Sequence, residues 1–151
     1  MDKHYLTPLF APQSIIVLAD TQESAALAAS SSYTQTLHEM LCAQRFSGKL
    51  TFIDPQISGT FADLAQAKAD LAIIAVPKES QLDSLELVGR IGCPTALIVS
   101  CGVDAEHARL LHQAAAHAGV HLMGPNSLGI QRPSLQLNAG VMGPLAKEGS
   151  L

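Results

Sequence analysis

Aromatic residues are scarce in this sequence, and charged residues are few. Of 151 residues only 4% are aromatic, tryptophan is absent and 15% are charged, whereas 48% are hydrophobic. The core must therefore be built from Ala, Leu, Ile and Val, and the high apolar share excludes a disordered tail or a coiled coil. The length suits one compact domain, which we place at residues 1–151.

Positive charge is also in short supply. The formal net charge of −4 argues against general nucleic-acid binding, because that function needs a basic face. The three cysteines, Cys42, Cys93 and Cys101, share no CxxC spacing. The sequence therefore predicts neither a disulfide framework nor a zinc site, and its thiols fit a reducing cytoplasm.

Long apolar runs and a secretory signal are missing as well. The longest run, residues 71–76 with its flanking alanine, is far too short to span a bilayer. The first residues show no charged and then apolar signal pattern. We therefore expect a cytoplasmic protein that does not enter a membrane.

Short apolar runs alternate with helical patterns along the chain. The runs at residues 14–19, 71–76 and 95–100 are nearly continuous Ile, Val, Leu and Ala, which is typical of strands covered on both faces. Further runs occupy residues 50–54 and, more weakly, 120–123. The helical patterns lie at residues 33–41, 61–67, 82–85 and 108–118. The alternation predicts an α/β fold: a Rossmann-like, doubly wound, mainly parallel sheet of five to six strands with helices on both faces.

The last helical pattern has recognisable ends, whereas the segment after it does not. Asp104 is a suitable N-cap for this helix, and Gly119 is a suitable C-terminal stop. Residues 134–151 read as a loop with weak alternation of apolar side chains. The final turn looks ready to enter another strand, so we expect the chain to be a fragment of a longer, multidomain protein.

Ligands of doubly wound sheets bind outside the carboxyl ends of the strands, where the strand order reverses. In the Rossmann order this point lies between the first and fourth strands, which places residues 19–21 and 100–102 at the site. Residues 54–55 and 76–77 end neighbouring strands on the same edge. The most distinctive motif, Gly-Pro-Asn-Ser-Leu-Gly at 124–129, follows the fifth strand and is either part of this edge or a tight structural turn.

The first strand-to-helix loop is where a nucleotide-binding fold holds phosphates. Here the loop has no glycine and carries Asp20 and Glu23. A carboxylate about 5 Å from a phosphate charge, at an effective dielectric of about 20, opposes binding by roughly 3 kcal/mol. Thr21 and Ser24 can still donate hydrogen bonds, and the alternative is a loop that only caps the following helix.

Further candidate residues lie at strand ends and on the last helix, and Asp54 and Lys78 have two interpretations each. Asp54 stands where NAD-binding folds hold an acid for the ribose hydroxyls, or it is a turn-former before Pro55. Lys78 either pairs with a phosphate or is simply solvated. We expect Cys101 to be an inert small thiol, because no local pattern ties a histidine to it. The evenly spaced histidines of the last helix point in different directions, so we predict neither a metal site nor a catalytic residue.

Several segments together resemble one known family. They are residues 9–18, 70–77 and 124–130, with Leu-Asn-Ala at 137–139 before a Gly-Pro loop. In this order they are similar, over nearly the whole chain, to the N-terminal CoA-binding domain of the ADP-forming acyl-CoA synthetases, which is related to the α subunit of succinyl-CoA synthetase. The same domain opens the large bacterial protein lysine acetyltransferases, whose form of the Gly-Pro-Asn motif has the Ser found at position 127.

The resemblance implies a Rossmann-like domain that binds CoA or acetyl-CoA, as a substrate, at the carboxyl edge of the sheet. The implied partners are this small-molecule CoA thioester and the remaining domains of a parent ligase or acetyltransferase, and self-association stays open. The isolated domain would bind CoA without catalysing a reaction. By position, the implied contacts are Asp20, Thr21, Ser24, Asp54, Pro55, Val76, Pro77, Ser100, Gly102 and Asn126.

The first loop departs from the family, which usually has glycines there. Two alternatives to CoA binding stay open. One is a degenerate Rossmann-like module that has a structural or regulatory role and binds no CoA. The other is an NAD-linked enzyme domain that uses Asp54.

Overall fold

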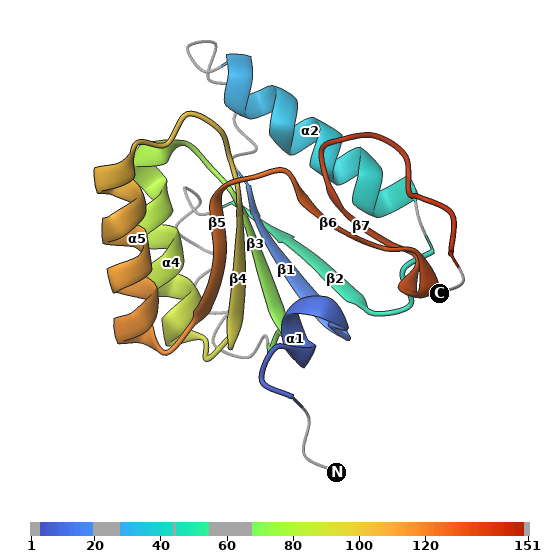
Figure 1. Cartoon of the computed structure of the whole chain (residues 1–151), viewed down its shortest axis with the longest axis horizontal. Helices are drawn as coiled ribbons and strands as arrows, with labels where there is room; N and C mark the ends of the chain where they lie inside the picture. The colour runs from blue at the N-terminus through green and yellow to red at the C-terminus, as the bar shows by residue number, and fades with distance from the viewer. Residues whose placement is uncertain (1–3, 20–27, 44, 55–67, 150–151) are drawn as a thin grey trace.

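A five-stranded parallel sheet forms the centre of the molecule (Figure 1). The computed structural model describes residues 4–19, 28–43, 45–54 and 68–149. The strands are β1 (Ser14–Ala19), β2 (Lys49–Ile53), β3 (Leu71–Ala75), β4 (Thr95–Val99) and β5 (His121–Ser127). The predicted α/β, Rossmann-like fold class is confirmed, with five strands in the sheet.

Both faces of the sheet are covered. Helices α4 (Gln81–Arg90) and α5 (Ala105–Ala118) pack on one face. The opposite face holds α1 (Thr7–Phe10), α2 (Ala28–Ala43) and an antiparallel hairpin of β6 (Gly129–Arg132) and β7 (Leu137–Gly140). Two short 3-10 turns, η1 (Lys78–Ser80) and η2 (Pro133–Leu135), lead into α4 and β7.

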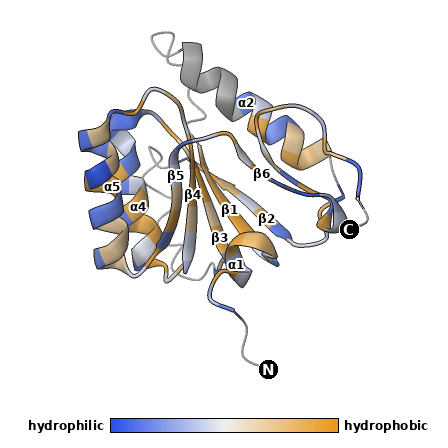
Figure 2. Ribbon diagram, viewed as in Figure 1, coloured by the Kyte–Doolittle hydropathy of each residue, from blue (hydrophilic) through white to orange (hydrophobic). Residues whose placement is uncertain are grey.

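Alternate residues of each central strand enter different cores. In β3, Ala72 and Ile74 pack toward α4 and α5, whereas Leu71 and Ile73 pack toward α2 and the hairpin. Because both sets are buried, the strand needs apolar side chains at every position. This explains the continuous apolar runs, and Figure 2 shows the hydrophobic central strands beside α5, whose outer side is polar.

The two edge strands have the weaker apolar runs for the same reason. Most residues of β2 and β5 are only partly buried, whereas every residue of β3 and β4 is buried. An edge strand has a neighbour on one side only, so fewer of its positions require an apolar side chain.

The strand order corrects one expectation. The order is β2-β1-β3-β4-β5, so the reversal lies between β1 and β3 and not between the first and fourth strands. The pairing of β1 with β3 runs from Ile15 opposite Leu71 to Ala19 opposite Ala75. The sequence could not distinguish the two possibilities, because β3 and β4 are equally apolar and either could lie beside β1.

The segment after β5 also differs from expectation. Residues 134–151 do not form a simple loop, because β7 pairs with β6 and all four of its residues are buried. The fifth strand is also longer than predicted and contains most of the Gly-Pro-Asn motif, with a cis peptide bond between Gly124 and Pro125. The side chain of Arg132 donates a hydrogen bond to the carbonyl oxygen of Phe10 and ties the hairpin to α1.

The predicted ends of α5 are confirmed. The Asp104 carboxylate accepts a hydrogen bond from the backbone N–H of His107 at 2.9 Å. Gly119 follows the last turn with φ of 69°, the left-handed conformation in which glycine meets no steric penalty. Among the helices in the described ranges, none has the length and apolarity needed to cross a bilayer.

Candidate functional site

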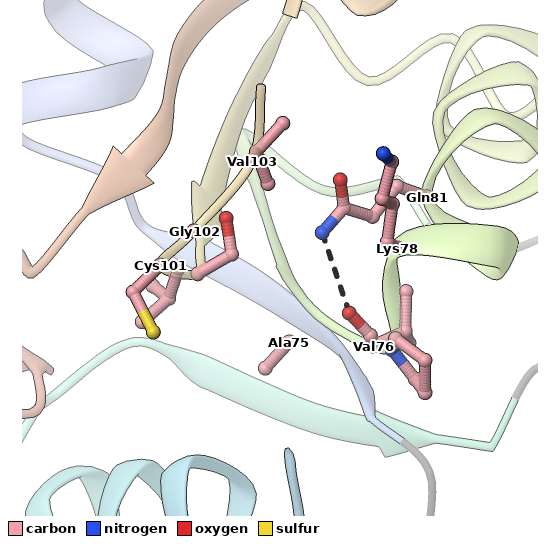
Figure 3. Close-up of a pocket in the computed structure, with 10 residues that line it drawn as sticks. Ala75, Val76, Lys78, Gln81, Cys101, Gly102 and Val103 are labelled. Carbon is pink, nitrogen blue, oxygen red and sulfur yellow. Dashed lines mark hydrogen bonds between the residues drawn. The ribbon is translucent and has the colours of Figure 1, made fainter. Parts of the chain in front are cut away.

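A pocket lies at the carboxyl edge of the sheet, between the loops that follow β3 and β4 (Figure 3). Residues 75–78 form one wall, residues 99–103 form the other, and Gln81 of α4 contributes its side chain. The cavity volume is about 120 Å³. Because β3 is the neighbour of β1, the pocket lies next to the reversal of strand order, where doubly wound sheets bind ligands.

Four of the residues named from the sequence line this pocket. Val76 and Pro77 follow β3, and Ser100 and Gly102 follow β4. Their meeting is a consequence of parallel pairing, which brings the carboxyl ends of adjacent strands to one edge. Gly102 has φ of 73°, so the loop after β4 turns through a conformation that favours glycine.

Asn126 contacts the loop after β4 and is not among the residues that line the pocket. Its Oδ1 accepts from the Val103 N–H at 2.9 Å, and its Nδ2 donates to the Val103 carbonyl at 2.8 Å. Its own N–H donates to the Ser100 hydroxyl at 3.3 Å. These bonds give the Gly-Pro-Asn motif a structural role: the motif holds the loop that forms one wall of the pocket.

The remaining predicted contacts lie apart from the pocket or outside the described residues. Asp54 is 5% exposed at the carboxyl end of β2, on the far side of β1 from β3. It does not line the pocket. Asp20, Thr21, Ser24 and Pro55 fall outside the described residues, as does the predicted helix at 61–67, so these remain predictions.

Lys78 is paired with a carboxylate, whereas the sequence left open a phosphate partner or a solvated side chain. Its ammonium group forms an ion pair with the Asp104 carboxylate, and both side chains are about half exposed. The hydrogen bond from Lys78, followed by that from the His107 N–H, lowers the pKa of Asp104 to about 2. The same bond raises the pKa of Lys78, to which Glu79 and Glu106 also contribute. Lys78, which lines the pocket, thus lies in the field of three carboxylates.

The Lys78–Asp104 pair predicts a specific acid sensitivity. The pKa of Asp104 is lowered from 3.8 to about 2 in the folded chain, so its charge stabilises the fold above pH 3.8 and loses this effect as the pH falls toward 2. We expect Asp104→Asn to show a smaller fall in Tm across this window than the unmodified chain. Thermal unfolding followed by circular dichroism from pH 2 to 7 measures the fall in Tm of both proteins. Equal falls in both proteins would contradict the assignment.

Cys93 and Cys101 lie in different surroundings. Burial raises the pKa of Cys93 to about 11, and its thiol donates to the Thr95 carbonyl at 3.3 Å, so Cys93 is a structural thiol. Cys101 is exposed and lines the pocket. Within the described ranges, no three His, Cys, Asp or Glu side chains gather as metal ligands.

Gln81 is a polar residue of the pocket that was not predicted from the sequence. It is 1% exposed although it is polar. A signal was present in the sequence: Gln81, Leu85 and Val88 are spaced by four and three residues, the pattern of one helix face, so the stripe that buries Leu85 and Val88 also buries Gln81.

Solved structures share this fold. The chain matches the dinucleotide-forming acetyl-coenzyme A synthetase 1 of Ca. Korarchaeum cryptofilum in its apo form with a TM-score of 0.74 and 23% identity over 90% of the chain. The same enzyme in complex with phosphate and ADP gives 0.72 and 22% over 90%. PH0766 of Pyrococcus horikoshii OT3 gives 0.76 and 25% over 95%. No family model matches the sequence.

This chain has the fold of one segment of those proteins. It spans 31%, 30% and 34% of their lengths, which is about a third in each case. The expectation from the sequence motifs is confirmed at the level of the fold: the solved neighbours include an acetyl-CoA synthetase, the type of enzyme that the motifs resemble.

Proposed function

We propose that the chain is a CoA- or acyl-CoA-binding domain of a larger protein similar to ADP-forming acyl-CoA synthetases. The observation that carries the proposal is the pocket at the carboxyl edge, which gathers Val76, Pro77, Ser100 and Gly102. These are positions that the family resemblance implies as CoA contacts. The fold shared with an acetyl-coenzyme A synthetase supports the same conclusion. The domain binds and orients CoA, and the chemistry belongs to other domains of the parent protein.

The charges near the pocket indicate which part of CoA the pocket would hold. Lys78 lines the pocket and lies in the field of Asp104, Glu79 and Glu106, so this part of the pocket disfavours a phosphate. Valine and alanine side chains make up much of the interior. The pocket therefore suits an uncharged part of CoA. The resemblance implies phosphate contacts at Thr21 and Ser24 of the first loop, which must act against the repulsion of Asp20 and Glu23.

A matched pair of glycine variants tests the proposal. Gly102 lines the pocket with φ of 73°, whereas Gly92 lies at the opposite edge of the sheet with φ of 69°, and neither has an atom within 4 Å of an added Cβ. We expect Gly102→Phe to weaken CoA binding by at least about tenfold, because the new ring competes for the pocket, a change of about 1.4 kcal/mol. We expect Gly92→Phe to bind CoA normally, although it carries the same backbone strain.

Isothermal titration calorimetry with CoA and acetyl-CoA measures these affinities. NADH serves as a second ligand, since binding of NADH without CoA would favour the NAD-linked alternative and Asp54. The absence of heat with millimolar CoA and acetyl-CoA would overturn the proposal. Equal losses in the two glycine variants would place CoA outside this pocket.

A degenerate module remains the second candidate, because the first loop has no glycine and carries Asp20 and Glu23. The double variant Asp20→Gly, Glu23→Gly removes both carboxylates and restores backbone freedom at the loop. CoA binding that appears only in this variant would assign the natural chain a structural or regulatory role. Binding by the unmodified chain would exclude that alternative.

A further inference from the structure

The pocket contains a buried amide whose hydrogen bonds are incomplete. Gln81 is 1% exposed, and its Nε2 reaches only the Val76 carbonyl, at the long distance of 3.5 Å (Figure 3). Its Oε1 is fully buried and meets no hydrogen-bond donor within the described part of the chain. Gln81 belongs to the wall of the pocket, so a rotation of its carboxamide would turn this acceptor toward a group that occupies the cavity.

An unpartnered buried carbonyl is unfavourable for the folded chain. Its loss of hydration is not offset by a hydrogen bond, whereas an apolar side chain of the same size carries no such penalty. Buried polar atoms in proteins are nearly always paired, so each exception calls for an explanation, and a missing ligand or water is one of them.

Neighbouring groups do not supply the missing donor. Lys78, which also lines the pocket, directs its ammonium group to Asp104. Ser84 lies one turn further along α4, and its hydroxyl is itself buried without a partner. The donor must therefore come from outside the described residues, and the carboxylates around Lys78 favour an uncharged group over an anion.

We propose that Gln81 is a specificity-determining residue of this pocket: its Oε1 accepts a hydrogen bond from an N–H group in an uncharged part of the ligand. This inference rests on the proposed function, because CoA offers such donors in two places. One is the amino group of adenine, and the other is the pair of amides in the pantetheine arm. The long bond from Nε2 to Val76 leaves the carboxamide free to adjust to either donor.

The test compares Gln81→Met with Ser84→Ala. Methionine keeps the length of the side chain and removes its hydrogen bonding. Ser84→Ala removes the other unpartnered polar atom of α4, which is not part of the pocket lining. We expect Gln81→Met to lower CoA affinity about tenfold, a change of about 1.4 kcal/mol. We expect Ser84→Ala to leave CoA affinity unchanged, and both variants to keep or raise Tm because each removes an unpartnered buried group.

The Tm separates this role from a structural one, since a glutamine that only supports the fold would lower Tm when replaced. Calorimetry with pantetheine and with 3′-phospho-ADP then locates the donor: the affinity for the fragment that carries it falls in Gln81→Met. Normal binding of CoA and of both fragments by Gln81→Met would overturn this inference and leave the proposed function intact. A failure of the unmodified chain to bind CoA would overturn both.

Discussion

Replacing Gly129 with alanine is expected to lower the free energy of unfolding by about 3 kcal/mol or more, because strain and overlap act together. Gly129 begins β6 with φ of 101°, a conformation that residues with a Cβ rarely adopt. The added Cβ would lie 2.1 Å from the Ala139 carbonyl oxygen and 2.3 Å from the Gly140 Cα. Both atoms are backbone of the paired strand, so relief of the overlap requires β6 and β7 to separate.

Gly143 provides the control for this variant. Its φ of 114° is also in the glycine region, but no atom lies within 4 Å of an added Cβ. We expect Gly143→Ala to cost only the backbone strain, about 1–3 kcal/mol. Urea denaturation followed by circular dichroism measures both values. Equal losses of unfolding free energy in the two variants would contradict the steric argument, because backbone strain at positive φ would then explain the whole effect.

The central strands were predictable because strands that are buried on both faces appear in the sequence as continuous apolar runs. The run at 14–19 coincides with β1, and those at 71–76 and 95–100 exceed β3 and β4 by one residue each. The hairpin on the second face was missed, since β7 has only four residues and contains Asn138, whose amide is satisfied by the Gly143 carbonyl at 2.9 Å. A short strand that contains a polar residue cannot be distinguished from a loop by sequence alone, because the hydrogen-bond partner of that residue is not visible in the sequence.

The site was predictable to the extent that strand ends define it. Val76, Pro77, Ser100 and Gly102 were named because each ends or follows an apolar run, and parallel pairing brings them to one pocket. The order of the strands depends on packing between segments that are far apart in the sequence, so the wrong pair was expected at the reversal. Gln81 was missed because a helix face gives no sign of which polar residue lacks a partner.

Asn126→Ala is the second substitution with a large expected effect, a loss of about 2–4 kcal/mol in the free energy of unfolding. Two bonds to the backbone of Val103, a residue only 8% exposed, disappear together. Alanine must also adopt the left-handed conformation that Asn126 holds at φ of 57°, which costs about 1–2 kcal/mol for a residue that is not Gly, Asn or Asp.

Asn126→Gly separates these two contributions. Glycine adopts positive φ without strain, so this variant loses only the side-chain bonds and should be more stable than Asn126→Ala by about 1 kcal/mol. Denaturation curves of the three proteins measure the difference. Equal stability of the two variants would contradict the strain at position 126.

Calorimetry on the same variants decides what Asn126 does for binding. If the residue acts by holding the loop that includes Ser100 and Val103, both variants should lose CoA affinity together with stability, since that loop is one wall of the pocket. If Asn126 instead contacts CoA directly, as the family resemblance implies, its replacement should weaken binding while stability stays near that of the unmodified chain. The hydrogen bonds to Val103 favour the first outcome, because they already engage both polar atoms of the side chain.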